Sequence, residues 1–144
     1  LSTIHTNDSV AAVTRMVDMG IESYLLASTV KAVLAQRLVR RLCNSCKEKY
    51  FLDSDMNVLK KGMEVFKPSG CHECNKTGFR GRVGIFELFL LDEEIKEAIN
   101  SGVTENKLSE LAFTEGHKLS DSGYELVQKG ITSVEEILRI TSEK

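Results

Sequence analysis

The sequence predicts a mainly α-helical fold with a small β element near its middle. Apolar side chains in the first third recur at helical spacing, and the last third contains short segments that begin near Asp, Thr or Ser and stop near glycine. Between them, "TGFRGRVGIFELFLL" combines β-branched and aromatic residues with glycine, which favours a short hairpin or a bent strand. We therefore expect helices to form most of the structure.

The first third of the chain predicts a strand followed by two helices. Ser2–Thr6 has the character of an extended segment, and either Asn7 or Asp8 can cap a helix that ends at Gly20. Over residues 22–38 the apolar side chains fall on one stripe of a helical wheel, and arginines crowd the last turns. This pattern predicts a long amphipathic helix that ends near the first cysteines.

The rest of the chain predicts further short helices. "DSDMNVLKKG" resembles a capped helix that ends at Gly62. The sequence Pro-Ser-Gly at residues 68–70 predicts a loop. Near the C-terminus, capped helices are expected over residues 92–100, 104–116, 120–130 and 133–141. The first three of these stop at or just before Gly102, Gly116 and Gly130.

The cysteines carry the clearest chemical signal. All four fall into two pairs, "CNSC" and "CHEC", with the spacing C-x2-C-x24-C-x2-C. Two such turns brought together offer four thiolates in a tetrahedron, which suits zinc. The sequence therefore predicts a closed structural zinc site formed by Cys43, Cys46, Cys71 and Cys74. His72 lies inside the second pair, but four sulfurs complete the coordination without it.

Composition excludes several classes of function. Charged residues make up 28% of the chain and the formal net charge is −2, so a broad basic surface for nucleic acid is not expected. No run of 18 apolar residues is present to cross a bilayer. No secretory leader precedes the first residue, so we expect a cytoplasmic location.

Several landmarks together resemble one family. "LSTIHTND", "DMGIESYLLASTVKAVLAQRLVRRLC", the cysteine pairs, "GFRGRVGIFELF" and "GITSVEEILR" are similar, in order, to the C-terminal part of the type II secretion and type IV pilus assembly (extension) ATPases. The resemblance covers nearly the whole chain and implies a fragment in three parts. These are the end of a RecA-like α/β P-loop NTPase core over 1–42, a zinc-binding insertion over 43–78, and a short β element with a helical subdomain over 79–144.

The catalytic consequences follow from what the 144 residues contain. No G-x-x-x-x-G-K-[ST] motif is present, so the fragment alone is not expected to hydrolyse ATP. The resemblance implies that ATP and Mg²⁺ bind in the full-length parent, with the P-loop and Walker B motif upstream. It also implies that His5, in the family's histidine box, lies near the γ-phosphate with Thr3 and Thr6 as neighbours. By residue type alone, a lone histidine such as His5 or His117 is more often structural.

The arginines Arg37, Arg40 and Arg41 leave two interpretations open. On the predicted helix, Arg37 and Arg41 are four residues apart, and like charges there cost about 0.2–0.5 kcal/mol unless an anion faces them. One interpretation is a solvated face near a helix C-terminus, where cations are favoured. The other is contact with nucleotide phosphates or with an acidic surface of a neighbouring subunit.

The resemblance also implies partners. Identical subunits would form a hexameric ring, and inner-membrane platform and cytoplasmic-domain proteins of the secretion or pilus machine would hold it at the inner membrane, with no nucleic acid involved. Two alternatives come from other classes. A nucleic-acid-binding zinc ribbon would also show paired cysteines, but the charge is near neutral and Trp is absent. A thiol redox protein needs a single C-x-x-C at a helix start.

Overall fold

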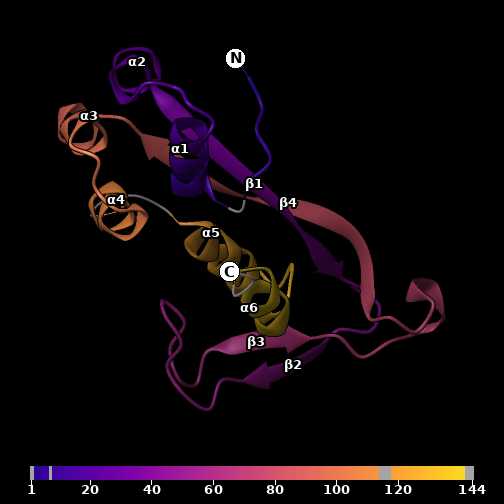
Figure 1. Ribbon diagram of the computed structural model, residues 1–144. Helices are drawn as coiled ribbons and strands as arrows, with labels where there is room; N and C mark the ends of the chain where they lie inside the picture. The colour runs from indigo at the N-terminus through magenta and orange to yellow at the C-terminus, as the bar shows by residue number, and fades with distance from the viewer. Residues whose placement is uncertain (1, 7, 114–117, 142–144) are drawn as a thin grey trace. The chain divides into compact units, whose positions relative to one another are not determined.

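The computed structural model describes residues 2–6, 8–113 and 118–141. Figure 1 shows the order of the helices and strands. The chain divides into two compact units, each built from two segments. Unit 1 comprises Leu1–Gln36 and Phe86–Lys118, and unit 2 comprises Arg37–Ile85 and Leu119–Lys144. Asn7, Gly116 and His117, which the sequence analysis singled out, lie outside the described residues.

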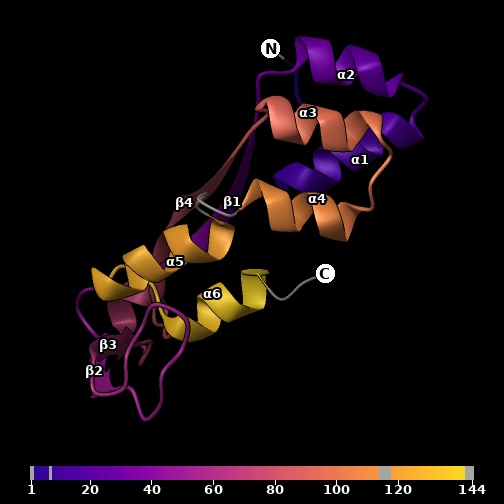
Figure 2. The ribbon, with the colours of Figure 1, turned by 90° about the vertical axis from the view of Figure 1, so that its left-hand side faces the viewer.

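The described part of unit 1 contains four helices, which Figure 2 shows gathered in one group. They are α1 (Ser9–Asp18), α2 (Ser23–Thr29), α3 (Glu93–Asn100) and α4 (Glu105–Ala112). Helix α3 contacts α2 and α4, and α4 contacts α1. The core of this unit, to which α1, α3 and α4 contribute, has eight buried residues: Val10, Val13, Phe89, Leu91, Ile95, Ala98, Ile99 and Leu108.

Side-chain caps fix the starts of three of these helices. The Asp8 carboxylate accepts the N–H of Ala11 at 2.8 Å. Asp92 accepts the N–H of Ile95 at 2.9 Å, and Thr104 caps α4 in the same way. Because a cap satisfies N–H groups that have no partner within the helix, it is worth about 1 kcal/mol. The predicted helix starts near 8, 92 and 104 are confirmed.

A buried carboxylate fastens α1 to the sheet. Ser9 donates both its N–H, at 3.0 Å, and its hydroxyl to Oε1 of Glu87. Glu87 is only 4% exposed and Ser9 is fully buried. Because a buried carboxylate is costly unless its oxygens accept hydrogen bonds, this contact fixes where α1 begins against the strand that carries Glu87.

The long helix predicted over residues 22–38 is wrong in its second half. Helix α2 ends at Thr29, and β1 (Ala32–Leu42) follows as a strand paired with β4 (Phe79–Leu90). Along β1, half-buried residues alternate with exposed ones as far as Val39, which is the period of a strand. Pairing with β4 overrides the helical stripe, since the β-branched valines of this run also suit a strand. Both β1 and β4 contribute residues to each unit.

Two other predicted elements differ from the structure. The strand predicted over Ser2–Thr6 is not formed. Among the described residues no strand pairs with this segment, and it is neither helix nor strand. The segment 53–62 forms turns around an isolated bridge between Met56 and Leu59 rather than a helix. Asn57, in the middle of this turn, has φ +52°, a left-handed conformation that interrupts a right-handed helix. The predicted strand near residue 79 is confirmed as the single strand β4, which Figure 1 shows curving near its start.

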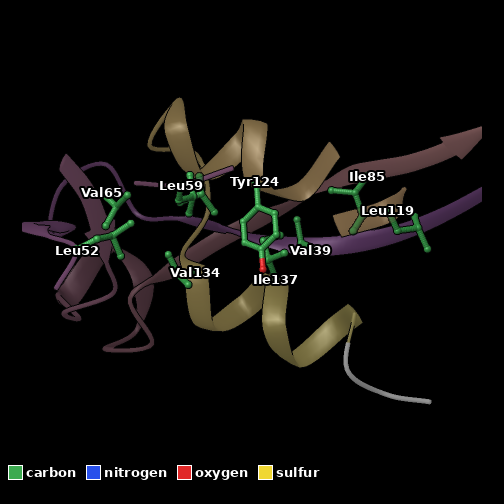
Figure 3. Close-up of a cluster of buried hydrophobic side chains, with 10 residues drawn as sticks. Val39, Leu52, Leu59, Val65, Ile85, Leu119, Tyr124, Val134 and Ile137 are labelled. Atoms are coloured by element: carbon green, nitrogen blue, oxygen red, sulfur yellow. The ribbon is translucent and has the colours of Figure 1, made fainter. Parts of the chain in front are cut away.

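Unit 2 packs two helices on a small hairpin. Strands β2 (Glu48–Phe51) and β3 (Glu64–Lys67) are antiparallel, with Glu48 opposite Lys67, and the sequence analysis missed both. Helices α5 (Leu119–Gln128) and α6 (Val134–Thr141) contact each other and β3. Figure 3 shows the core between them. Its buried residues are Val39, Leu52, Leu59, Val65, Ile85, Leu119, Tyr124, Val127, Val134 and Ile137.

Among the described residues, no helix combines the length and apolar character needed to cross a membrane.

Candidate metal centre

The four cysteines converge on one point in unit 2. Their sulfur atoms all lie within 4.8 Å of one another. The Sγ atoms of Cys43 and Cys71 are 3.9 Å apart, and Cys74 Sγ lies 3.8 Å from both Cys46 Sγ and Cys71 Sγ. Four sulfurs about 2.3 Å from a central zinc would form a tetrahedron with edges of about 3.8 Å. The residues present therefore fit a tetrahedral metal ion, as the spacing of the pairs predicts.

Two short turns carry the four cysteines. Cys43 directly follows β1, and its carbonyl accepts the N–H groups of Cys46 at 3.3 Å and Lys47 at 3.0 Å. The second pair encloses a single 3₁₀ turn, η1 (His72–Cys74). The N–H of Cys43 donates to the carbonyl of Gly78 at 2.9 Å, which joins the two turns.

Backbone N–H groups point at the sulfurs. Cys74 Sγ accepts from Cys71 N at 3.1 Å and from Gly78 N at 3.2 Å. These bonds, that of Cys71 above all, stabilise the thiolate and lower the pKa of Cys74 to about 6. Burial acts in the opposite direction on Cys46 and raises its pKa to about 12, although Gly70 N donates to its sulfur at 3.3 Å. A cation among the sulfurs would favour the thiolate form of all four.

The donor set indicates the kind of metal. Four sulfur ligands suit a soft or borderline ion, and zinc in a Cys₄ shell has no open position for substrate. His72 is exposed and is not part of the cluster, in agreement with its exclusion on sequence grounds. All four thiols are free rather than joined as disulfides. The arrangement can hold an ion and close the loop between the pairs, but it cannot present a metal-bound water.

The arginines lie on β1, so the helical argument about their spacing does not apply. The Nη1 of Arg37 donates to the carbonyl of Ile140 at 2.8 Å. Arg40 meets Glu136 through its backbone N–H and through its guanidinium, and Arg41 is exposed. Contacts of these residues with nucleotide or with another subunit stay a prediction.

Sequence reasoning missed the buried acid Glu136. Its side chain is 0% exposed, and Arg40 Nη2 lies 2.7 Å from Oε2 while Arg139 Nη2 lies 2.9 Å from Oε1. Burial raises the pKa of Glu136, but the hydrogen bonds from Arg40 and Arg139 outweigh it and lower the pKa to about 2. The only local signal was Arg139, three residues later on the same helix, because Arg40 lies 96 positions earlier in the chain.

His5 belongs to unit 1, whereas the four cysteines belong to unit 2. It is exposed, and with Thr6 it lines an open hollow of about 430 Å³. Thr14, Arg15 and Asp18 of α1 and Glu105 of α4 form other parts of the wall. Thr3 is exposed and is not part of this lining. The role of His5 toward nucleotide stays a prediction.

The chain is similar to known secretion proteins over nearly all its length. A family profile described as "Type II/IV secretion system protein" matches residues 1–139. The chain is 43% identical to the type II secretion system ATPase E of Vibrio cholerae, with 99% of this chain and 29% of that protein aligned. It is 46% identical to type II secretion system protein E of Aeromonas hydrophila, covering 99% of this chain and 30% of that protein.

Two further comparisons extend this result. The type IV pilus assembly ATPase TfpB of Acinetobacter baylyi is 37% identical, with 97% of this chain and 25% of that protein covered. The X-ray structure of the Legionella pneumophila ATPase DotB aligns with 97% of this chain and 31% of its own, at a TM-score of 0.57 and 15% identity, which shows a likeness of fold. The chain thus spans about 30% of the length of the first relatives. Because the profile matches almost every residue and whole-chain relatives exceed 40% identity, the chain belongs to the Type II/IV secretion system protein family.

Proposed function

We propose that this chain is the zinc-binding portion of an ATPase that powers type II protein secretion or type IV pilus assembly. The observation that carries the proposal is the tetrahedral arrangement of four cysteine sulfurs within a chain that the family profile matches from residue 1 to residue 139. The relatives named above include both type II secretion and type IV pilus ATPases.

The metal is proposed to be structural zinc. Cys43, Cys46, Cys71 and Cys74 would hold it, and the ion would stabilise residues 43–78 without taking part in hydrolysis. Convergence of both pairs on one centre favours this reading over a thiol redox protein, which would use one pair alone. A nucleic-acid-binding zinc ribbon is the alternative, and the net charge of −2 disfavours it.

ATP hydrolysis is proposed for the full-length parent. The 144 residues contain no P-loop motif, so ATP and Mg²⁺ would be bound largely by the rest of that protein. Residues 1–42 would end a RecA-like core, residues 79–144 would add a helical subdomain, and identical subunits would form a hexameric ring. The likeness of fold to DotB supports this assignment.

His5→Ala in the full-length parent is expected to lower the turnover of ATP by about 100-fold with little change in nucleotide affinity. A side chain beside the γ-phosphate acts mainly on the transition state, so kcat falls while binding of the ground state is kept. Steady-state hydrolysis and a nucleotide titration measure the two quantities separately. His72→Ala, at an exposed histidine outside the cysteine cluster, is the matched control.

Unchanged turnover in His5→Ala, or a loss fully explained by weaker nucleotide binding, would contradict this role. Magnesium-dependent ATP hydrolysis by the 144-residue chain alone would contradict the proposal that the rest of the parent is needed to bind ATP and Mg²⁺.

The segment 43–78 is also proposed to dock near the inner membrane, on the platform protein of the secretion or pilus machine. The parent would then act in the cytoplasm, peripheral to the membrane. We expect the metal-loaded chain to retain the platform protein in a pull-down, and Cys71→Ser with Cys74→Ser to abolish retention. Ser45→Ala, in the first cysteine turn but not a ligand, should behave as the unmodified chain. Equal retention by the double cysteine variant would show that docking lies elsewhere.

A further inference from the structure

The turn before α6 contacts the chain on both sides of the first cysteine pair. Immediately before Cys43, the N–H of Leu42 donates to the carbonyl of Ile131 at 2.8 Å. Immediately after Cys46, the Nζ of Lys47 donates to the carbonyl of Gly130 at 2.8 Å. The first pair of ligands is therefore bracketed by hydrogen bonds to residues more than 80 positions later in the chain.

Glu136, in the helix that follows this turn, connects to the chain beside the second cysteine pair through Arg40. Its carboxylate accepts three bonds from Arg40: the backbone N–H at 3.0 Å, Nε at 3.0 Å and Nη2 at 2.7 Å. The same guanidinium lies 4.1 Å from the ring centroid of Phe79. Phe79 follows Gly78, which donates to Cys74 Sγ and accepts from the N–H of Cys43. One buried carboxylate thus orients an arginine three residues before Cys43, and the guanidinium of that arginine packs on the residue that follows Gly78.

Because Glu136 is buried, its carboxylate needs a hydrogen-bond donor at each oxygen. The Glu136 side chain is 0% exposed, so an unpaired charge there would be costly, and Arg139 supplies the remaining donors. The hydroxyl of Thr132 donates to the carbonyl of Arg40 at 2.8 Å, which adds a second backbone contact between this part of the chain and the strand. Because every donor has a defined direction, the end of β1 has little freedom to move away from α6.

We infer that Glu136 is a positioning residue for the cysteine cluster, setting its affinity for metal by holding the end of β1 in the geometry that the ion requires. This rests on the proposed zinc-binding function. Partners outside the ligand shell that orient the ligands commonly change metal affinity by 10–100-fold. Linkage makes the effect reciprocal, so bound metal stabilises the docking of α6 by the same factor.

The test compares zinc affinity with global stability in the 144-residue chain. Zinc Kd is measured by competition with a chromophoric chelator, and the free energy of unfolding is measured with urea. Glu136→Gln keeps the size of the side chain and removes its charge, and we expect Kd to rise about tenfold. Val127→Ala, in the core of unit 2 and not at a ligand, is expected to lower stability and to leave Kd within about twofold, because the folded molecules present the same cysteine geometry to the metal.

A second readout keeps the inference falsifiable if the variant is poorly folded. In the unmodified chain, adding zinc should slow amide hydrogen exchange in Val134–Thr141, and Glu136→Gln should lose this zinc-dependent protection. An unchanged zinc Kd in Glu136→Gln would overturn the inference. So would a rate of amide hydrogen exchange in α6 of the unmodified chain that is the same with and without zinc. If the unmodified chain binds no zinc at all, the proposed metal function itself fails, which is a distinguishable result.

Discussion

Cys74→Ser is expected to abolish stable zinc binding and to unfold the segment 43–78. Cys74 is buried, its sulfur lies 3.8 Å from two other ligand sulfurs, and two backbone N–H groups stabilise its thiolate. A serine hydroxyl is a poor zinc ligand at neutral pH. Because structural zinc can contribute on the order of 10 kcal/mol of folding free energy, the loss should exceed that of any core substitution in unit 2.

Metal analysis of the purified chain measures the first effect, and hydrogen exchange of residues 43–78 measures the second. Chelation of the unmodified chain should reproduce the variant, with exchange rising first in this segment. Ser45→Ala alters the turn between Cys43 and Cys46 and removes only an exposed hydrogen bond to Glu73. This variant should therefore retain one equivalent of zinc. Protein that carries well below one equivalent of any metal, and is unaffected by chelator, would rule out the zinc site.

Gly78→Ala is expected to destabilise the metal centre far more than Gly81→Ala. Both glycines have similar positive φ, +76° and +78°, so each alanine pays a backbone cost of about 1 kcal/mol. At Gly78 a Cβ would also overlap with the Cβ of Pro68, whereas the space at Gly81 is open. Relief of that overlap must move either the loop containing Pro68 or Gly78 itself. The Gly78 N–H donates to Cys74 Sγ, and its carbonyl accepts the Cys43 N–H, so a shift of Gly78 would disturb both cysteine turns.

The difference in unfolding free energy between the two variants is expected to be about 2 kcal/mol or more, since forced overpacking costs about 1–3 kcal/mol before hydrogen bonds are lost. Urea denaturation of the zinc-loaded variants measures it, and chelator-driven zinc release should be faster in Gly78→Ala alone. Equal stability of the two variants would show that the loop containing Pro68 yields freely and that Gly78 does not set the cluster geometry.

Local chemistry explains which features could be predicted from sequence. Asp8, Asp92 and Thr104 act as caps through N–H groups three residues away, so the signal and its partner lie in one short window. The cysteine cluster was also predictable, because paired spacing and sulfur chemistry restrict four residues to one kind of site. Neither inference needed knowledge of distant pairing.

The features that were missed depend on distant contacts. Residues 32–42 carry an apolar pattern that fits a helix or a strand, and pairing with β4, about forty positions later, decides for the strand. The contact between Arg40 and Glu136 joins residues 96 positions apart, so neither side chain reveals its partner locally. The strands β2 and β3 have four residues each, too few for a period of two to be distinguished from a turn.

The discontinuous order of unit 2 has a consequence for the nascent chain on the ribosome. Val39, Val65 and Ile85 are synthesised first, but their core partners Tyr124 and Ile137 come after the whole second segment of unit 1. At about 5–20 residues per second, those apolar side chains wait several seconds for a partner. The cysteine turns need no such wait, because Cys43 and Cys71 are 28 positions apart and all four ligands precede that gap. Metal capture during translation would therefore fold the loop of unit 2 before its helices exist, and it would hold β1 and the start of β4 together until α6 arrives.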